Sequence, residues 1–244
     1  MGAALDAPLF ADGDRFGAGL NRRSVPMRTR IKICGITRLE DGVAAARAGA
    51  DAIGFVFWSG TPRVVTLERA RAIASALPPF VTVVGLFVDP APDAVWTALA
   101  TVPLDILQFH GDEAPALCRA FGRPYLKAIP VSGTAGQAGL LEYAARYGDA
   151  AGLLFDAPPS GGLPGGTGRT FDWDALPKLT GRSIVLSGGL SAGNVGEAVR
   201  RVRPWAVDVS SGVEAVGADG RPEKGIKDPA RIAAFIEEVR HADV

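Results

Sequence analysis

The chain has 244 residues, of which 26 are basic and 26 acidic, so its formal net charge is zero. This length fits one α/β barrel or two small domains, and either could bury a substantial core. The balanced charge gives no sign of a nucleic-acid partner or an anionic membrane, and no apolar run approaches transmembrane length.

The N-terminal residues 1–30 contain Asp, Gly and Arg without the apolar core of a secretory signal. We predict a disordered extension here, and Met27 is a candidate alternative start. Cys34 and Cys118 form neither a disulfide nor a metal-binding pattern, which favours a reduced, cytoplasmic setting. Cys118 lies in a helical run and is expected to be an inert core residue.

From Ile31 onward, short apolar runs alternate with amphipathic stretches rich in Ala and Arg. The predicted strands are Ile31–Cys34, Ala52–Phe57, Val81–Val88, Ile106–His110, Tyr125–Ile129, Gly152–Asp156, Ser183–Ser187 and Ala206–Val209. The predicted helices are Leu39–Ala48, Leu67–Leu77, Pro92–Ala100, Ala114–Phe121, Leu140–Tyr147, Trp173–Leu179, Val195–Val202 and Pro229–Arg240. Thr66 and Asp228 stand at N-cap positions.

Eight strands, each followed by a helix, imply a parallel sheet with right-handed crossovers. The even spacing predicts a single (β/α)₈ barrel of the TIM type over residues 31–244, with no break that marks a second domain. An open doubly wound sheet is the alternative, but no G-x-G-x-x-G follows the first strand.

The first predicted strand ends with two chemically active side chains, Lys32 and Cys34. Side chains alternate between the faces of a strand, so these two share one face. An ammonium beside a thiol favours the reactive thiolate. The plainer alternative is a buried Cys that packs as a small apolar residue. The adjoining strand end and turn glycine favour the functional interpretation.

Polar residues also close the other strands of the predicted barrel, where such barrels carry their chemistry. They are Gln108 and His110, Lys127, Asp156, and Asp208 with Ser210, and alternation allows all of them to point inward. Lys127 paired with an Asp could instead be a structural ion pair. Five polar strand ends are difficult to explain by core packing alone.

Two glycine-rich loops fit a phosphate group. Ser187, Gly188 and Gly189 follow the seventh predicted strand, and Ser210, Ser211 and Gly212 follow the eighth. Loops at these positions commonly bind phosphate through backbone N–H groups. A third glycine-rich stretch, Gly161–Gly168, could be a mobile lid or a solvated linker.

These residues lie in motifs that resemble one known family. The motifs are KICGIT (Lys32–Thr37), GADAIGFVF (Gly49–Phe57), PRV (Pro62–Val64), QFHG (Gln108–Gly111), LFD (Leu154–Asp156), GGTGRTFDW (Gly165–Trp173), LSGGL (Leu186–Leu190), NV (Asn194–Val195), AVDVSSGVE (Ala206–Glu214) and KGIKD (Lys224–Asp228). In this order the chain resembles phosphoribosylanthranilate isomerase, an enzyme of tryptophan biosynthesis. The N-terminal extension, Thr61 and the stretch Pro158–Pro164 depart from the family pattern.

The resemblance implies an Amadori rearrangement of N-(5-phosphoribosyl)anthranilate, with Cys34 and Asp156 as general base and acid. Expected substrate-binding residues are Lys32, Arg63, Gln108, His110 and Asp208, and expected phosphate-binding residues are Gly188, Gly189, Ser210, Ser211 and Gly212. Arg63 would grip the anthranilate carboxylate. His110 could alternatively be a core histidine. No metal or organic cofactor is expected, the partner is a small phosphorylated substrate, and the oligomeric state is left open.

Three rival functions are considered. A histidine-pathway isomerase performs the same rearrangement on a similar barrel, but with two carboxylates, and Cys34 argues against it. An aldolase or synthase could form a Schiff base on Lys127. A non-catalytic binding barrel would keep the phosphate loops and lose the acid or the base, yet Cys34 and Asp156 are both present.

Overall fold

The computed structural model describes residues 28–132, 136–158, 165–166, 168–179 and 181–243. Eight parallel strands close into a barrel in chain order, β1 next to β2 and β8 next to β1. Their bounds are β1 Arg30–Cys34, β2 Ala52–Val56, β3 Thr82–Phe87, β4 Ile106–Phe109, β5 Tyr125–Pro130, β6 Gly152–Asp156, β7 Ile184–Leu186 and β8 Ala206–Val209. The predicted (β/α)₈ barrel is confirmed.

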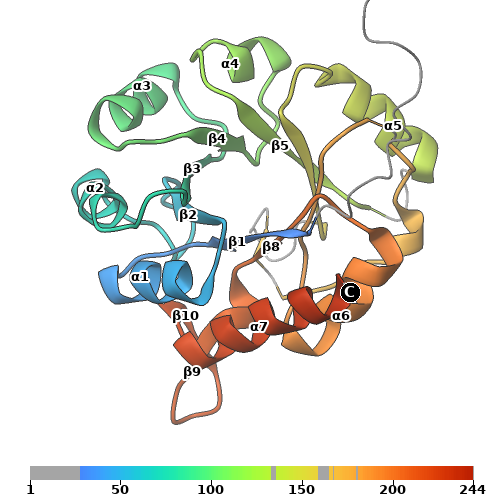
Figure 1. The fold of residues 1–244 in the computed structure, drawn as a ribbon. Helices are drawn as coiled ribbons and strands as arrows, with labels where there is room; N and C mark the ends of the chain where they lie inside the picture. Colours follow the sequence, from blue (N-terminus) through green and yellow to red (C-terminus); the bar gives the residue numbers. More distant parts are fainter. Residues whose placement is uncertain (1–27, 133–135, 159–164, 167, 180, 244) are drawn as a thin grey trace, which may run out of the picture.

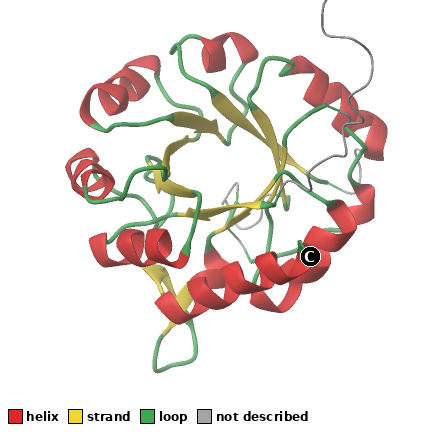
Figure 2. Ribbon diagram, viewed as in Figure 1, coloured by secondary structure: helices red, strands yellow, loops and turns green. Residues whose placement is uncertain are grey.

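The α-helices form a ring around the strands (Figures 1 and 2). They are α1 Leu39–Ala48, α2 Leu67–Ser75, α3 Pro92–Thr101, α4 Pro115–Arg119, α5 Gly136–Arg146, α6 Ala192–Val202 and α7 Pro229–Ala242. The Thr66 side chain accepts from Arg69 N, and the Asp228 carboxylate accepts from Ala230 N, so both predicted N-caps are confirmed. Among the described residues, no helix is long and apolar enough to span a membrane.

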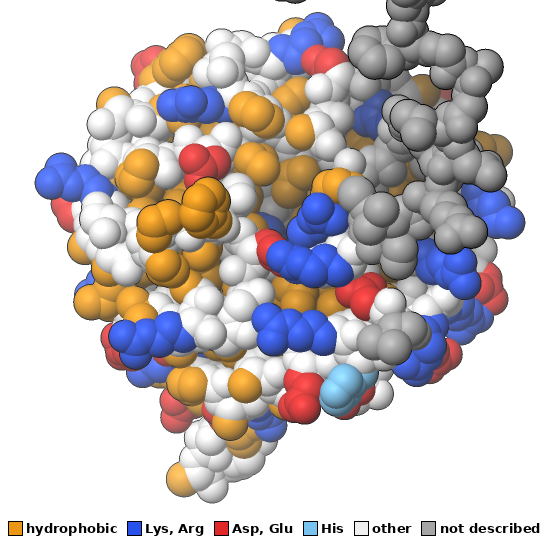
Figure 3. Space-filling model, in the orientation of Figure 1, with side chains coloured by type: hydrophobic (Ala, Val, Ile, Leu, Met, Phe, Trp, Pro, Cys, Tyr) orange, Lys and Arg blue, Asp and Glu red, His pale blue; other side chains and the backbone are white. Residues whose placement is uncertain are grey.

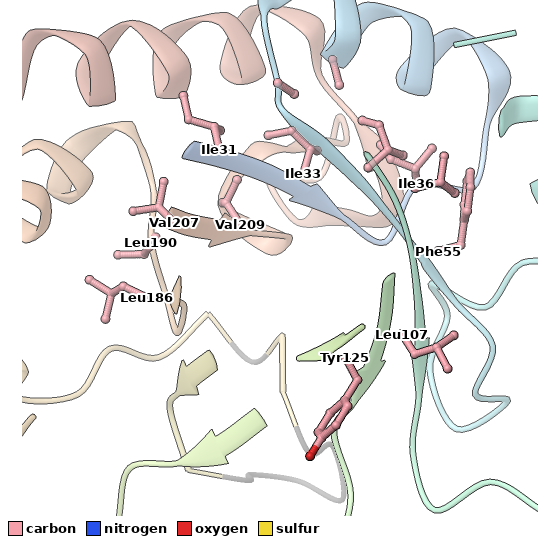
Figure 4. Close-up of a cluster of buried hydrophobic side chains, with 14 of the residues drawn as sticks. Ile31, Ile33, Ile36, Phe55, Leu107, Tyr125, Leu186, Leu190, Val207 and Val209 are labelled. Atoms are coloured by element: carbon pink, nitrogen blue, oxygen red, sulfur yellow. The ribbon is translucent and has the colours of Figure 1, made fainter. Parts of the chain in front are cut away.

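Alternation along each strand separates two apolar regions. Ile31 and Ile33 on β1 and Val207 and Val209 on β8 point to the same side, toward the helices (Figure 4). The barrel interior has a smaller apolar cluster, made by Ala128, Leu154, Val185 and Ala206. The residues on the inner face that lie nearer the carboxyl ends of the strands are therefore free to be polar.

Two elements differ in kind from the sequence prediction. The predicted helix Trp173–Leu179 is a 3₁₀ turn, Trp173–Ala175, followed by extended Leu176. Pro177 explains this, because proline disfavours a helical conformation in the residue before it. The hairpin of β9 (Glu214–Val216) and β10 (Pro222–Lys227) was not predicted. It projects beside α7 and α1 in Figure 1.

The predicted N-terminal extension meets the barrel at its last residues. Arg30 begins β1, and Thr29 N and Oγ1 both donate to the Asp243 carboxylate at the end of α7. Residues 1–27, including Met27, lie outside the described residues, as do 161–164 and 167 of the stretch predicted as a lid.

Charged side chains of both signs are mixed over the face drawn in Figure 3.

Candidate active site

The carboxyl ends of the strands surround a pocket of about 670 Å³, including space open to solvent. A pocket at this end of the strands is the usual place for a small-molecule site in barrels of this kind. Ten of the twelve predicted site residues line it: Cys34, Arg63, Gln108, His110, Asp156, Gly188, Gly189, Asp208, Ser210 and Ser211. Lys32 lies beneath it against Asp208, and Gly212 packs against the Leu190 carbonyl.

Cys34 closes β1, and its thiol lies beside the Lys32 ammonium, as the alternation predicts. A Cβ placed on Gly54 of β2 would be 3.0 Å from the Cys34 Sγ and 3.1 Å from the Lys32 Nζ, so this glycine leaves room for both side chains. Burial raises the pKa of the Cys34 thiol, and this outweighs the opposing effect of Lys32. The predicted stabilised thiolate is therefore wrong in its net direction.

The ammonium of Lys32 is engaged by a partner that the sequence did not assign to it. Lys32 Nζ donates to Asp208 Oδ1 at 2.8 Å, and both side chains are buried. Burial alone would lower the pKa of Lys32, but the charges of Asp208 and Cys34 raise it overall. The Lys32 ammonium therefore interacts with Asp208 as well as with the Cys34 thiol, which was its only predicted partner.

Asp156, at the end of β6, belongs to a hydrogen-bonded row of three side chains. Its Oδ2 lies 3.1 Å from His110 Nε2, and Gln108 Nε2 lies 3.0 Å from His110 Nδ1. The other carboxylate oxygen accepts from Ala157 N at 2.8 Å. Gly165 lies over this row, since a Cβ placed on it would be 2.5 Å from Asp156 Oδ2. His110 thus lines the pocket and contacts Asp156 there, and it does not belong to the apolar core.

Arg63 reaches the pocket from the loop after β2. Its Nε donates to Glu214 Oε1 at 2.6 Å and its Nη2 to Glu214 Oε2 at 2.9 Å. The two-pronged edge predicted to grip a substrate carboxylate is therefore occupied by Glu214. Lys227 Nζ lies 3.4 Å from Glu214 Oε1 and donates to the Ser210 carbonyl at 2.9 Å. The sequence patterns predict no role for Glu214 or Lys227.

Two cations, Arg63 and Lys227, lie against the one carboxylate of Glu214 in this group. Burial would raise the pKa of Glu214, but Arg63 and Lys227 hold it below its usual value. Burial lowers the pKa of Lys227 to about 8, against the attraction of Glu214. Both residues lie in motifs quoted above, AVDVSSGVE and KGIKD, but their pairing with Arg63 is seen only in the fold, where β9 and β10 bring them back to the barrel mouth.

The two predicted phosphate loops lie together at the pocket. Gly188 and Gly189 have φ of 84° and 61°, which favours glycine. A Cβ on Gly189 would be 2.5 Å from the Arg169 backbone, and one on Gly212 would be 1.9 Å from the Leu190 carbonyl oxygen. The glycines are thus required by the packing of the chain against itself, in addition to any approach of an anion.

Lys127 does not point into the barrel. It pairs in register with Phe109, whose ring lies in the outer core, and Lys127 Nζ donates to Glu113 Oε2 at 2.8 Å. The predicted inward orientation is wrong, and the partner is a Glu rather than an Asp. Three acceptors surround the fully buried ammonium, so Lys127 is a structural ion-pair residue and a poor Schiff-base nucleophile.

An apolar wall that the sequence patterns do not predict completes the pocket. Val56, Trp58, Leu86 and Val88 line it together with Cys34. Strand alternation could have placed Val56 and Leu86 inside, but parallel strands are apolar on both faces and hide that signal. Among the described residues, no group of three or more His, Cys, Asp or Glu side chains could hold a metal ion.

Comparison with known proteins agrees with this architecture. The family described as N-(5'-phosphoribosyl)anthranilate (PRA) isomerase matches residues 31–238. N-(5'-phosphoribosyl)anthranilate isomerase of Thiobacillus denitrificans is 54% identical over 214 residues, covering 88% of this chain and 99% of the relative. The enzyme of that name from Halorhodospira halophila is 54% identical over 217 residues, covering 89% and 99%.

Solved structures give the same result. Phosphoribosyl anthranilate isomerase from Thermus thermophilus has a TM-score of 0.74 at 37% identity, covering 87% of this chain and 99% of that one. A phosphoribosyl anthranilate isomerase in complex with reduced 1-(o-carboxyphenylamino)-1-deoxyribulose 5-phosphate has a TM-score of 0.71 at 39% identity, with the same two coverages. The fold and its pocket are those of a barrel enzyme. The chain belongs to the N-(5'-phosphoribosyl)anthranilate isomerase family.

Proposed function

We propose that this chain catalyses the Amadori rearrangement of N-(5'-phosphoribosyl)anthranilate to 1-(2-carboxyphenylamino)-1-deoxyribulose 5-phosphate, a step of tryptophan biosynthesis. The observation that carries the proposal is the pairing of Cys34 on β1 with Asp156 on β6 around one pocket, in a chain of this family. The isomerisation requires one group that gives a proton and one that removes a proton, and these two side chains supply them.

In the proposed reaction Asp156 acts as the acid and Cys34 as the base. Asp156 gives a proton to the ribose ring oxygen as the C1–O bond breaks, which leaves a cationic Schiff base between C1 and the anthranilate nitrogen. Cys34 then removes the proton from C2 to give an enolamine, which becomes the 2-ketone when C1 gains a proton and the C2 hydroxyl loses its proton. The overall composition is unchanged, as an isomerisation requires.

The environment of Cys34 bears on the second transfer. Its thiol has a raised pKa because it is buried, so the neutral thiol is favoured before substrate opens. A cationic Schiff base beside the thiol would favour the thiolate, since an opposite charge nearby stabilises an ionised group. Lys32, held by Asp208, adds to that effect. A larger fraction of Cys34 is thereby present as the thiolate, the form that can accept the C2 proton, when the intermediate forms.

Recognition follows from the shape and charge of the pocket. The anthranilate ring would lie on the apolar wall of Val56, Trp58, Leu86 and Val88, with its carboxylate at the side of Arg63 that Glu214 does not occupy. The phosphate would accept from the backbone N–H groups of the loops after β7 and β8. Gln108, His110 and Asp208 would bind or orient the sugar and the reacting nitrogen.

We place the catalytic unit in residues 31–244, with residues 1–30 as an extension outside the chemistry. The family match over residues 31–238 supports this division. We also place the enzyme in the cytoplasm, acting on a small phosphorylated substrate. The thiols of Cys34 and Cys118 are both free and buried, which is in keeping with a reducing compartment.

The decisive experiment follows the fluorescence of the anthranilate glycoside with the full chain and with a chain that begins at Met27. The full chain should convert the glycoside to the ketose, and the Cys34→Ala variant should not do so at a comparable rate. The shorter chain should be as active as the full one. Absence of conversion by a folded full-length chain would refute the proposed reaction.

A further inference from the structure

A buried ion pair lies on the outer side of the barrel wall, directly behind the candidate acid–base site. Lys127 is on β5, and Glu113 precedes α4 in the loop that follows His110. Both side chains have no solvent-accessible surface, and Lys127 Nζ donates to Glu113 Oε2 at 2.8 Å. Neither residue lines the pocket, so a direct part in the reaction is not indicated.

The hydrogen bonds of this pair converge on the backbone around one residue. Lys127 Nζ also donates to the carbonyl oxygens of Phe109, at 3.4 Å, and Gly111. Glu113 accepts from Gly111 N, at 3.0 Å to Oε1 and 3.1 Å to Oε2. The peptide groups before and after His110 are therefore both bound by the ion pair.

A second loop is attached to the same pair. Glu113 Oε1 accepts from Asp89 N at 2.9 Å, and Asp89 has a φ of 44°, which is uncommon for a residue other than glycine. Asp89 Oδ1 in turn accepts from Asp112 N at 2.7 Å. The loops after β3 and β4 thus share one carboxylate, and Val88 and His110 from these loops both line the pocket.

We infer that Lys127 and Glu113 are positioning residues that hold His110, and through it Asp156, in the geometry required for proton transfer. His110 is constrained on its backbone by the ion pair and by its own N–H to the Phe87 carbonyl at 2.9 Å. Its imidazole extends from that backbone to Asp156 Oδ2. This inference rests on the proposed function, which gives Asp156 its role as the acid.

Stability alone is a weak explanation for such a pair. Replacing a buried ion pair with apolar residues of similar volume is often neutral or stabilising, whereas removing one partner leaves a costly buried charge. Apart from the bond between them, Lys127 and Glu113 form their hydrogen bonds with main-chain atoms of residues 109, 111 and 89. What an apolar pair could not replace is the placement of the His110 backbone.

The test compares the double substitution Lys127→Met with Glu113→Leu against the wild type. The matched control is Tyr125→Phe, which removes a hydrogen bond from the same strand to Asp149, remote from His110. The chain has only two histidines, and His241 is exposed, so ¹⁵N-histidine NMR gives one signal set for the site and an internal reference. Thermal unfolding, kcat and KM are measured alongside.

A positioning role predicts that the folded double variant has displaced His110 signals and unchanged His241 signals. Its kcat should fall roughly ten- to a hundredfold, with KM changed less, because small misplacement of a reacting group is costly. The Tyr125→Phe control should have the His110 signals and the kcat of the wild type. Wild-type kcat, or an unmoved His110 signal, in the folded double variant overturns the inference.

If the double variant does not fold, Glu113→Gln, which keeps the shape and removes the charge, is judged by the same two readouts. The NMR measurement requires no turnover. If the wild type lacks the proposed activity, the proposed function is refuted. The inference that the ion pair positions His110 would still stand if the His110 signals of the variants differ from those of the wild type.

Discussion

The Arg63 guanidinium and the Glu214 carboxylate, 151 residues apart in the chain, form a two-pronged ion pair with N–O distances of 2.6 and 2.9 Å. Both side chains are buried beside the pocket. Such an arrangement fixes the plane of the guanidinium as well as its position. The proposed carboxylate site is therefore built by two segments together, the loop after β2 and the start of β9.

Arg63→Ala should mainly raise KM, because the proposed contact with the substrate carboxylate is made equally in the ground state and the transition state. Arg63→Lys should be intermediate, since an ammonium keeps the charge but cannot match the fork of Glu214. Steady-state kinetics with the anthranilate glycoside decides. A large fall in kcat at unchanged KM would instead place Arg63 in the chemical step.

The acid–base pair is tested by Cys34→Ala and Asp156→Asn. Each should lower kcat by roughly 10²- to 10⁴-fold, which is the usual contribution of a general acid or base, while the thermal unfolding midpoint remains near that of the wild type. Cys34→Ser should also be strongly impaired, because a hydroxyl is a far poorer base. Near-wild-type turnover in any of the three would remove that residue from the mechanism.

The raised pKa of the Cys34 thiol has a direct chemical consequence. In a Cys118→Ser background, where one thiol remains, alkylation by iodoacetamide should be slow at neutral pH. The rate should reach half its maximum above pH 9, the ordinary value for a thiol, because the thiolate is the reacting form. Rapid alkylation with a midpoint below that value would show an activated thiol.

The phosphate proposal predicts that inorganic phosphate inhibits competitively. The dephosphorylated substrate should also lose kcat/KM, since remote binding energy helps to position the reacting sugar. Gly212→Ala should weaken phosphate binding, because its Cβ would displace the Leu190 backbone. Gly193→Ala in α6 is the control, since its Cβ would make only an ordinary contact with Ser191. Unchanged kcat/KM for the dephosphorylated substrate would exclude the proposed phosphate site.

Lys227 predicts a pH dependence of stability. Its folded-state pKa is lowered to about 8 from an ordinary value of 10.5, so between these values the unfolded chain binds more protons. The free energy of unfolding should therefore rise with pH across this window, through relief of the buried charge. The free energy of unfolding is measured in denaturant for the wild type and for Lys227→Met at each pH, and the difference between them isolates this contribution. A difference that stays constant or falls between pH 8 and 10.5 would contradict it.

Several features of the fold could be read from local patterns. Period-two alternation placed Cys34, Asp156 and Asp208 on the inner face, and side-chain caps at Thr66 and Asp228 marked two helix starts. The start of α6 was predicted three residues late. There Asn194 Oδ1 accepts from Ser191 N at 2.8 Å and begins the helix at Ala192. The signal was present in the Ser191–Asn194 spacing.

It was harder to predict whether a side chain near the end of a strand points into the barrel or outward, and which residue it pairs with. Lys127 satisfied the expectation of a polar strand tip, yet its register with Phe109 directs it outward to Glu113. The pKa of the Cys34 thiol was expected to fall because of Lys32, but burial outweighs this effect, and Asp208 on the neighbouring strand shares the Lys32 ammonium. In both cases the partner is distant in the sequence, so local spacing could not identify it.

The sequence by itself determined the barrel, because eight alternating apolar and amphipathic segments can bury their faces together in that closed arrangement. It also determined which end of the barrel carries polar groups, and the family to which these motifs belong. Only the tertiary structure decided how the charges are shared. The hairpin of β9 and β10 brings Glu214 and Lys227 next to Arg63, and burial raises the pKa of the Cys34 thiol. Charge partners and desolvation depend on three-dimensional proximity, which local sequence patterns do not encode.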